Sequence, residues 1–223
     1  MKNKSFIIGT IVVIFCCIMA IVDGVLKADY FIKSAIKLVL FLGFPALYAL
    51  TEKELKITPL FKFNKRSMGL SIGLSISVYL IIVGGYTILK SVFDFSQITK
   101  SLTENIGVTR NNFIFVSLYI SFINSLLEEF FFRGFAFLAL KQVTSRCFAY
   151  FFSASAFAIY HIAMMIGWFS MELLFLVLLG LFAGGMLFNY LNEKTGNIYP
   201  SWLVHMFANF AINTIGFILF GII

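Results

Sequence analysis

The chain has 223 residues, of which 61% are hydrophobic and only 12% are charged, and its mean hydropathy is +0.97. Soluble domains contain about 45–50% apolar and about 25% charged residues, so this composition excludes an ordinary soluble protein and predicts an integral membrane protein. The net charge of +7 does not indicate nucleic-acid binding, because the basic residues stand in short loops between apolar segments, where they set orientation and contact lipid headgroups.

Seven segments are long and apolar enough to cross a bilayer, since a spanning helix needs about 20 mostly apolar residues. They are residues 5–22, 31–50, 68–89, 112–140, 147–166, 170–191 and 199–221. The predicted fold class is therefore all-α, a polytopic membrane bundle of about seven transmembrane helices.

The first two segments carry lysines near their starts. Lys2 and Lys4 precede the first segment, which resembles a signal peptide but has the length of a retained anchor. Lys33 and Lys37 lie in the first two turns of the second segment, where their ammonium groups can snorkel to the membrane interface. Pro45 predicts a kink later in the same helix.

The distribution of basic residues predicts a cytoplasmic N-terminus and an outer C-terminus. In that orientation ten basic residues are cytoplasmic, namely Lys2, Lys4, Lys53, Lys56, Lys62, Lys65, Arg66, Lys141, Arg146 and Lys194. Six are outside, namely Lys27, Lys33, Lys37, Lys90, Lys100 and Arg110. The excess on the cytoplasmic side agrees with the positive-inside rule.

Local patterns refine three of the later segments. The connection 90–111 has Ile98, Leu102 and Ile106 at helical spacing and a Ser101–Glu104 capping-box pattern, which predicts a short surface helix. Pro200 suits the first turn of the last span. Gly180, Gly184 and Gly185 predict a seam of close helix contact.

Six strongly polar residues stand deep within the predicted spans. They are Glu128, Glu129 and Arg133 in the fourth span, His161 in the fifth, and His205 and Asn209 in the seventh. Ionisable groups inside a membrane are costly and generally face a bundle interior or a wet cavity. A rise of about 1.5 Å per residue places Glu128, His161, His205 and Asn209 in one broad band of depth, so we expect these three helices to line one cavity.

Helical spacing assigns different roles to these residues. Glu129 and Arg133 are four residues apart, which favours an ion pair on one face. Glu128 projects about 100° away from Glu129 and has no such partner in its own segment, which suits a carboxyl group that exchanges protons. His205 and Asn209 share a face and can hold a developing negative oxygen.

Three motifs occur in order along the chain: Glu128-Glu129-x-x-x-Arg133, then Phe157-x-x-x-His161, then His205-x-x-x-Asn209. Together they resemble the CAAX protease and bacteriocin-processing (CPBP/Abi) family of intramembrane glutamate endopeptidases, which are related to the type II CAAX prenyl proteases. The resemblance covers about residues 112–215 and implies that residues 112–223 form the catalytic helix core. Residues 1–111 would then supply the N-terminal helices and loops of the same membrane domain.

The resemblance implies a division of labour among the motif residues. Glu128 would be the general base, and His161 would position the attacking water. His205 and Asn209 would stabilise the oxyanion. Glu129 and Arg133 would hold the local geometry, and Phe157 would pack beside the site.

The resemblance also implies a substrate class and a location. The expected substrate is a membrane-associated peptide or a lipidated protein, processed either at a CAAX-type terminus or at a bacteriocin or pheromone leader. Bacteriocin self-immunity is a related role, favoured by the Phe-, Ile-, Lys- and Asn-rich composition typical of AT-rich bacterial genomes. The expected protein is a multi-pass component of the cell membrane whose partners are this substrate and the lipid bilayer, without nucleic acid.

Other interpretations of the same residues remain open. The Glu129–Arg133 pair and the two histidines also suit purely structural bridges between helices. Glu128, His161 and His205 form a ligand set compatible with zinc, although the chain has no HExxH motif, and we expect no cofactor. A catalytically silent Abi-like scaffold is a second function, and a proton-coupled transporter is a third, but the latter predicts a repeat that is not apparent.

Overall fold

The helices form where the apolar segments stand. The computed structural model describes residues 2–52, 58–63 and 65–223. Lys53 and Lys56, which the orientation prediction uses, lie outside the described residues. Within the described ranges the chain forms helices and no strand, in the order α1 (Lys2–Gly24), α2 (Tyr30–Leu38), η1 (Val39–Gly43), α3 (Phe44–Thr51), η2 (Thr58–Phe61), α4 (Lys65–Leu89), α5 (Ser96–Ile106), α6 (Phe113–Tyr119), η3 (Ile120–Asn124), α7 (Ser125–Glu128), η4 (Glu129–Ala139), α8 (Arg146–Met165), α9 (Met171–Thr195) and α10 (Tyr199–Leu219).

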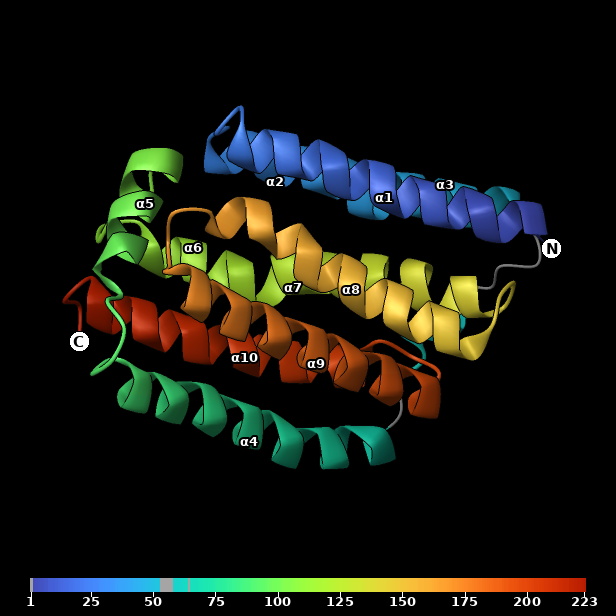
Figure 1. Ribbon diagram of the computed structural model, residues 1–223. Coiled ribbons are helices and arrows are strands. Elements are labelled where there is room, and N and C mark those ends of the chain that lie inside the picture. Colours follow the sequence, from blue (N-terminus) through green and yellow to red (C-terminus); the bar gives the residue numbers. More distant parts are fainter. Residues whose placement is uncertain (1, 53–57, 64) are drawn as a thin grey trace.

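The all-α membrane fold is confirmed. Over the described part of the chain, seven helices are long and apolar enough to span a membrane, at Asn3–Gly24, Tyr30–Thr51, Met68–Leu89, Phe113–Ala139, Arg146–Met165, Met171–Thr195 and Tyr199–Leu219. Each falls on a predicted segment. The two termini lie at opposite ends of the bundle, as an odd number of spans requires (Figure 1). Which end faces the cytoplasm stays a prediction, as does the division of the chain at residue 111.

The spans are arranged in layers (Figure 1). The helices α1, α2 and α3 cover one side of the bundle, and α4 lies on the opposite side along α10. Between them, α8 packs against α1, η4 and α9. The helices that carry the three motifs are therefore central, and the N-terminal spans cover them from outside.

Two spans contain π-helical segments, in which the turn is wider than in an α-helix. In the second span η1 stands directly before α3, whose first turn holds Pro45, so the irregular backbone lies where the proline predicts it. In the fourth span η3 and η4 flank the single turn α7, which ends at Glu128. Such segments redirect side chains at functional sites in many helices.

Aromatic packing fills the space between the N-terminal spans and η4. Phe131 and Phe132 are fully buried, and the ring of Phe131 stacks on that of Phe41 with centroids 4.0 Å apart. Phe132 also contacts Tyr160 and Phe157 of α8. These rings hold α2, η1, η4 and α8 in fixed relation, which sets the geometry around Glu128.

Two local predictions were wrong in detail. The short helix in the connection 90–111 is present as α5, but it begins at Ser96, whose amide donates to Asp94. Ser101 lies inside it and does not cap its start. At the predicted glycine seam, only Gly185 makes a close approach: a Cβ there would lie 3.0 Å from Cα of Ala154, whereas Gly180 and Gly184 face nothing within 4 Å. Pro200 stands in the first turn of α10, as predicted.

Candidate active site

Glu128 lies at the centre of a polar cluster in the bundle interior. It ends α7 immediately before η4, and only 2% of its surface is exposed. Its two carboxylate oxygens have different surroundings. Oε1 contacts an ammonium and an amide group, whereas Oε2 faces two imidazole rings.

The partner of Oε1 comes from the second span. Lys37 Nζ lies 2.6 Å from Oε1, and Asn124 Nδ2 donates to the same oxygen at 3.0 Å. Lys37 is 5% exposed, so the prediction that it snorkels was wrong. The same holds for Lys33, which is buried and paired with Asp23 at 2.6 Å. In each case a buried carboxylate within ion-pairing distance compensates the charge of the ammonium group, so the side chain does not extend to the membrane interface.

The other oxygen, Oε2, faces His161 of α8 and His205 of α10. It lies 4.0 Å from His161 Nε2 and 3.6 Å from His205 Nε2. His161 Nδ1 lies 2.7 Å from the Phe157 carbonyl oxygen, which can only accept, so Nδ1 carries the proton of this hydrogen bond. In the neutral ring Nε2 is then an acceptor directed at Oε2. The spacing leaves both atoms able to share one water, at about 2.8 Å from each.

Glu129 joins His205 to Arg133. His205 Nδ1 donates to Glu129 Oε1 at 2.9 Å, and Arg133 Nε lies 3.7 Å from Glu129 Oε2. The predicted contact between Glu129 and Arg133 is therefore present, but the hydrogen bond to His205, 76 residues further along, is an addition. Both Glu129 and Arg133 are fully buried. This arrangement orients the His205 ring and places negative charge behind it.

The Arg133 guanidinium lies between aromatic rings. Its Cζ is 4.3 Å from the ring centroid of Phe157 and 5.1 Å from that of Phe188. Phe157, predicted to pack beside the site, also contacts the rings of His161 and His205. These edge-to-face and cation–π contacts restrict the rotation of all three polar side chains.

Asn209 stands one turn after His205 on α10. Its Nδ2 donates to the Ile120 carbonyl oxygen at 3.1 Å, in the π-helical segment η3. The wider turn there lets this carbonyl accept from a side chain in addition to the Ser125 amide. One of the two N–H groups of Asn209 is thus used to tie α10 to η3, and the other is available to a ligand.

The zinc alternative involves Glu128, His161 and His205. In the described ranges no three His, Cys, Asp or Glu side chains are grouped so as to hold a metal ion. Lys37 occupies the position beside Oε1 with its own positive charge, whereas Oε2 and the two Nε2 atoms face one another. The absence of a cofactor therefore stays a prediction.

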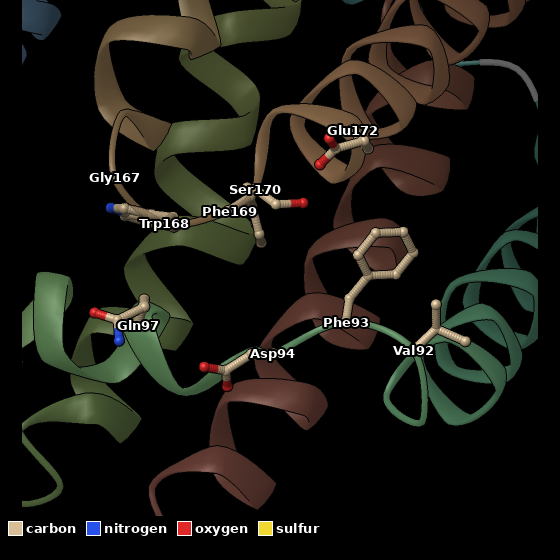
Figure 2. Close-up of a pocket in the computed structure, with 9 residues that line it drawn as sticks. All are labelled: Val92, Phe93, Asp94, Gln97, Gly167, Trp168, Phe169, Ser170 and Glu172. Carbon is tan, nitrogen blue, oxygen red and sulfur yellow. The ribbon is translucent and has the colours of Figure 1, made fainter.

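A hollow lies away from this cluster, between the α4–α5 and α8–α9 connections (Figure 2). Its volume is about 500 Å³, and its lining comprises Val92, Phe93, Asp94, Gln97, Gly167, Trp168, Phe169, Ser170 and Glu172. Hydrogen bonds from the Ser96 amide and hydroxyl hold the pKa of Asp94 below its ordinary value. Glu172 stands in the first turn of α9, where a carboxylate complements the helix dipole. Both carboxylates thus stabilise the N-terminal ends of helices, and the side chains that line the hollow do not form a catalytic group.

Comparison with known families identifies the part of the chain that carries this geometry. A family model described as type II CAAX prenyl endopeptidase Rce1-like matches residues 110–211. This segment is similar to the type II CAAX prenyl endopeptidase family over those residues. Comparisons with curated proteins and with solved structures gave no match. The match suggests a membrane protease, and the seven candidate spans agree with a membrane protein.

The Rce1-like segment contains every residue of the three motifs, from Glu128 to Asn209. Lys37 lies outside it, on a span that the resemblance does not cover. Sequence reasoning missed this residue, because a lysine near the start of a span usually marks the interface. Two signals were available: a second lysine one turn before it, and the carboxylate at Glu128 that lacked a partner in its own helix.

Proposed function

We propose that the protein is an intramembrane endopeptidase in which Glu128 and His161 activate water for attack on a peptide bond. The observation that carries this proposal is the convergence of α7, α8 and α10 on one buried oxygen, Oε2 of Glu128. A general base needs an acceptor oxygen within reach of the water it deprotonates, and a second group that orients that water. Oε2 and His161 Nε2 supply both.

The reaction follows from the positions of these atoms. Glu128 removes a proton from the water, and the resulting hydroxide forms a bond to the scissile carbonyl carbon while the C=O pair moves to oxygen. When the carbonyl re-forms, the C–N bond breaks and the amine nitrogen takes the proton from Glu128. The products are a carboxylic acid and an amine, and the carboxylate is restored.

His205 and Asn209 are proposed to stabilise the oxyanion. His205 donates from Nδ1 to Glu129, and in the protonated ring Nε2 is a second donor. The second N–H of Asn209 supplies another donor. Arg133 and Phe157 hold this arrangement without contacting the reacting atoms. Donors of this kind act strongly where water is excluded.

The proposed substrate is a membrane-associated or lipid-tethered peptide, because the cluster is buried among spanning helices. The family description favours a prenylated CAAX terminus, and a bacteriocin or pheromone leader is the other candidate. We further propose a multi-pass protein of the cell membrane with a cytoplasmic N-terminus, in contact with lipid and not with nucleic acid. Bacteriocin self-immunity remains part of this proposal, and no metal is required in it.

The test uses the full chain reconstituted in vesicles with two labelled substrates, a farnesylated CAAX peptide and a leader peptide. We expect wild-type cleavage of one of them to persist after chelation. Glu128→Gln should reduce it by about 10²- to 10⁴-fold, the usual contribution of a general base. The matched control is Glu172→Gln, which removes an exposed carboxylate in the first turn of α9.

The outcomes separate the alternatives. Equal cleavage by wild type and Glu128→Gln would overturn the catalytic assignment. Loss on chelation with recovery on adding zinc would restore the metal interpretation. Absence of cleavage of both substrates, with a folded protein, would favour the scaffold.

A further inference from the structure

Lys37 is buried in the middle of the bundle beside Glu128, which the sequence separates from it by 91 residues. A charged lysine in a membrane span is costly and is retained where a partner or a function compensates for it. Here 5% of its surface is exposed, and its ammonium group lies near two aromatic rings. Nζ lies 5.0 Å from the ring centroid of Tyr160 and 5.5 Å from that of Phe41.

The contacts of Lys37 form a closed set around one oxygen of Glu128. Nζ donates to Glu128 Oε1 at 2.6 Å and to Asn124 Oδ1 at 2.5 Å. Asn124 in turn donates from Nδ2 to the same Oε1 at 3.0 Å. Nζ, Oδ1, Nδ2 and Oε1 thus contact one another, which restricts rotation of the carboxylate. The remaining oxygen, Oε2, can then turn only towards the two histidines.

Charge makes the same contact necessary for catalysis. A general base must be ionised, and burial of an isolated carboxylate favours its neutral form. The charged and titratable groups near Glu128 are Lys37 and Tyr30 from α2, His161 and Tyr160 from α8, and His205 from α10. Both histidines can be neutral, and Arg133 is engaged with Glu129. Lys37 is the cation in direct hydrogen-bonding contact with the carboxylate.

We propose that Lys37 is a positioning residue for peptide hydrolysis: its ammonium group anchors Oε1 of Glu128 and keeps the carboxylate charged, so that Oε2 is presented to the attacking water. The inference rests on the proposed function, and it adds a residue from a span outside the family match. The second span is thus more than a cover for the motif helices, because it completes the general base.

Lys33 offers a matched control one turn earlier on α2. It is also buried and also forms a 2.6 Å ion pair, but with Asp23 of α1 and not with the site. Lys33→Met removes a comparable buried pair without changing the surroundings of Glu128. It separates the loss of a structural ion pair from the loss of charge at the base.

The cleavage test compares Lys37→Met, Lys37→Arg and Lys33→Met across pH, with activity normalised to folded protein. We expect Lys37→Met to reduce the cleavage rate about tenfold or more at neutral pH. The acidic limb of its plot of kcat against pH should move upward by about one pH unit or more, since an opposite charge at this distance has an effect of that size. Lys37→Arg should keep the position of the limb. Lys33→Met should lower stability and leave the limb unchanged.

An infrared measurement tests the contact without cleavage. Lys37→Met should show a carboxylic-acid C=O stretching band at neutral pH that wild type lacks, and adding Glu128→Gln should abolish it. A wild-type pH profile in Lys37→Met without this band, or a variant faster than wild type at neutral pH, would overturn the proposal. If wild type fails to cleave, the proposed function fails and the reaction role of Lys37 fails with it, whereas the band still reports whether Lys37 holds Glu128 charged.

Discussion

Replacement of Arg133 by Met tests how the buried ion pair supports the site. The side chain is fully buried, with its Nε 3.7 Å from Glu129 Oε2 and its guanidinium between the rings of Phe157 and Phe188. At that separation and an effective dielectric constant of about 20, the Coulomb attraction is about 4 kcal/mol. Breaking one side of a buried pair costs about 3–5 kcal/mol, because the remaining charge is uncompensated.

Two features of the structure reduce this cost. Glu129 keeps its hydrogen bond from His205 when Arg133 is removed. The three guanidinium nitrogens have no hydrogen-bond partner within the described ranges, so Met replaces donors that are already unsatisfied. We therefore expect Arg133→Met to lower the free energy of unfolding by about 3 kcal/mol. Arg133→Ala should cost more and reduce the amount of folded protein, because it also leaves a cavity between the rings.

The measurement is equilibrium unfolding of the purified protein in detergent, for wild type, Arg133→Met, Glu129→Gln and the double variant. Each single change leaves the other partner buried and uncompensated. The double variant should therefore lose clearly less unfolding free energy than the sum of the losses in the two single variants. Strict additivity of the three values would refute the reasoning, since it would mean that the charges at 3.7 Å do not interact.

Two further predictions concern the packing of the motif helices. Gly185→Ala should lower the unfolding midpoint by forcing α8 and α9 apart, because its Cβ would lie 3.0 Å from Cα of Ala154. The control, Gly184→Ala, places a Cβ with nothing within 4 Å and should keep or raise the midpoint. Equal midpoints for the two variants would contradict the close contact between α8 and α9. Asn209→Asp should lower the free energy of unfolding by about 1–3 kcal/mol, since it places an oxygen in place of a donor against the Ile120 carbonyl oxygen. An unchanged midpoint in thermal unfolding would argue against that hydrogen bond.

Local rules were sufficient for the spans and for the internal geometry of each motif. A run of about 20 apolar residues has few alternatives to a helix in lipid, because every backbone group must bond internally. For the same reason the face shared by Glu129 and Arg133, and the place of Pro200 in the first turn of α10, followed from spacing alone. The polar residues in the spans also predicted that α7, α8 and α10 meet.

The partners that cross between helices were decided only by the tertiary structure. Lys37 and Glu128 are 91 residues apart, and His205 and Glu129 are 76 apart, so no periodicity connects them. The π-helical segments on either side of α7 shift the direction of each later side chain, which helical counting with a constant turn does not reproduce. The packing of the spans decides which lysine is buried and which oxygen of Glu128 faces the histidines. In lipid, the way helices pack depends on their shape and on polar contacts between them rather than on hydrophobicity along the chain.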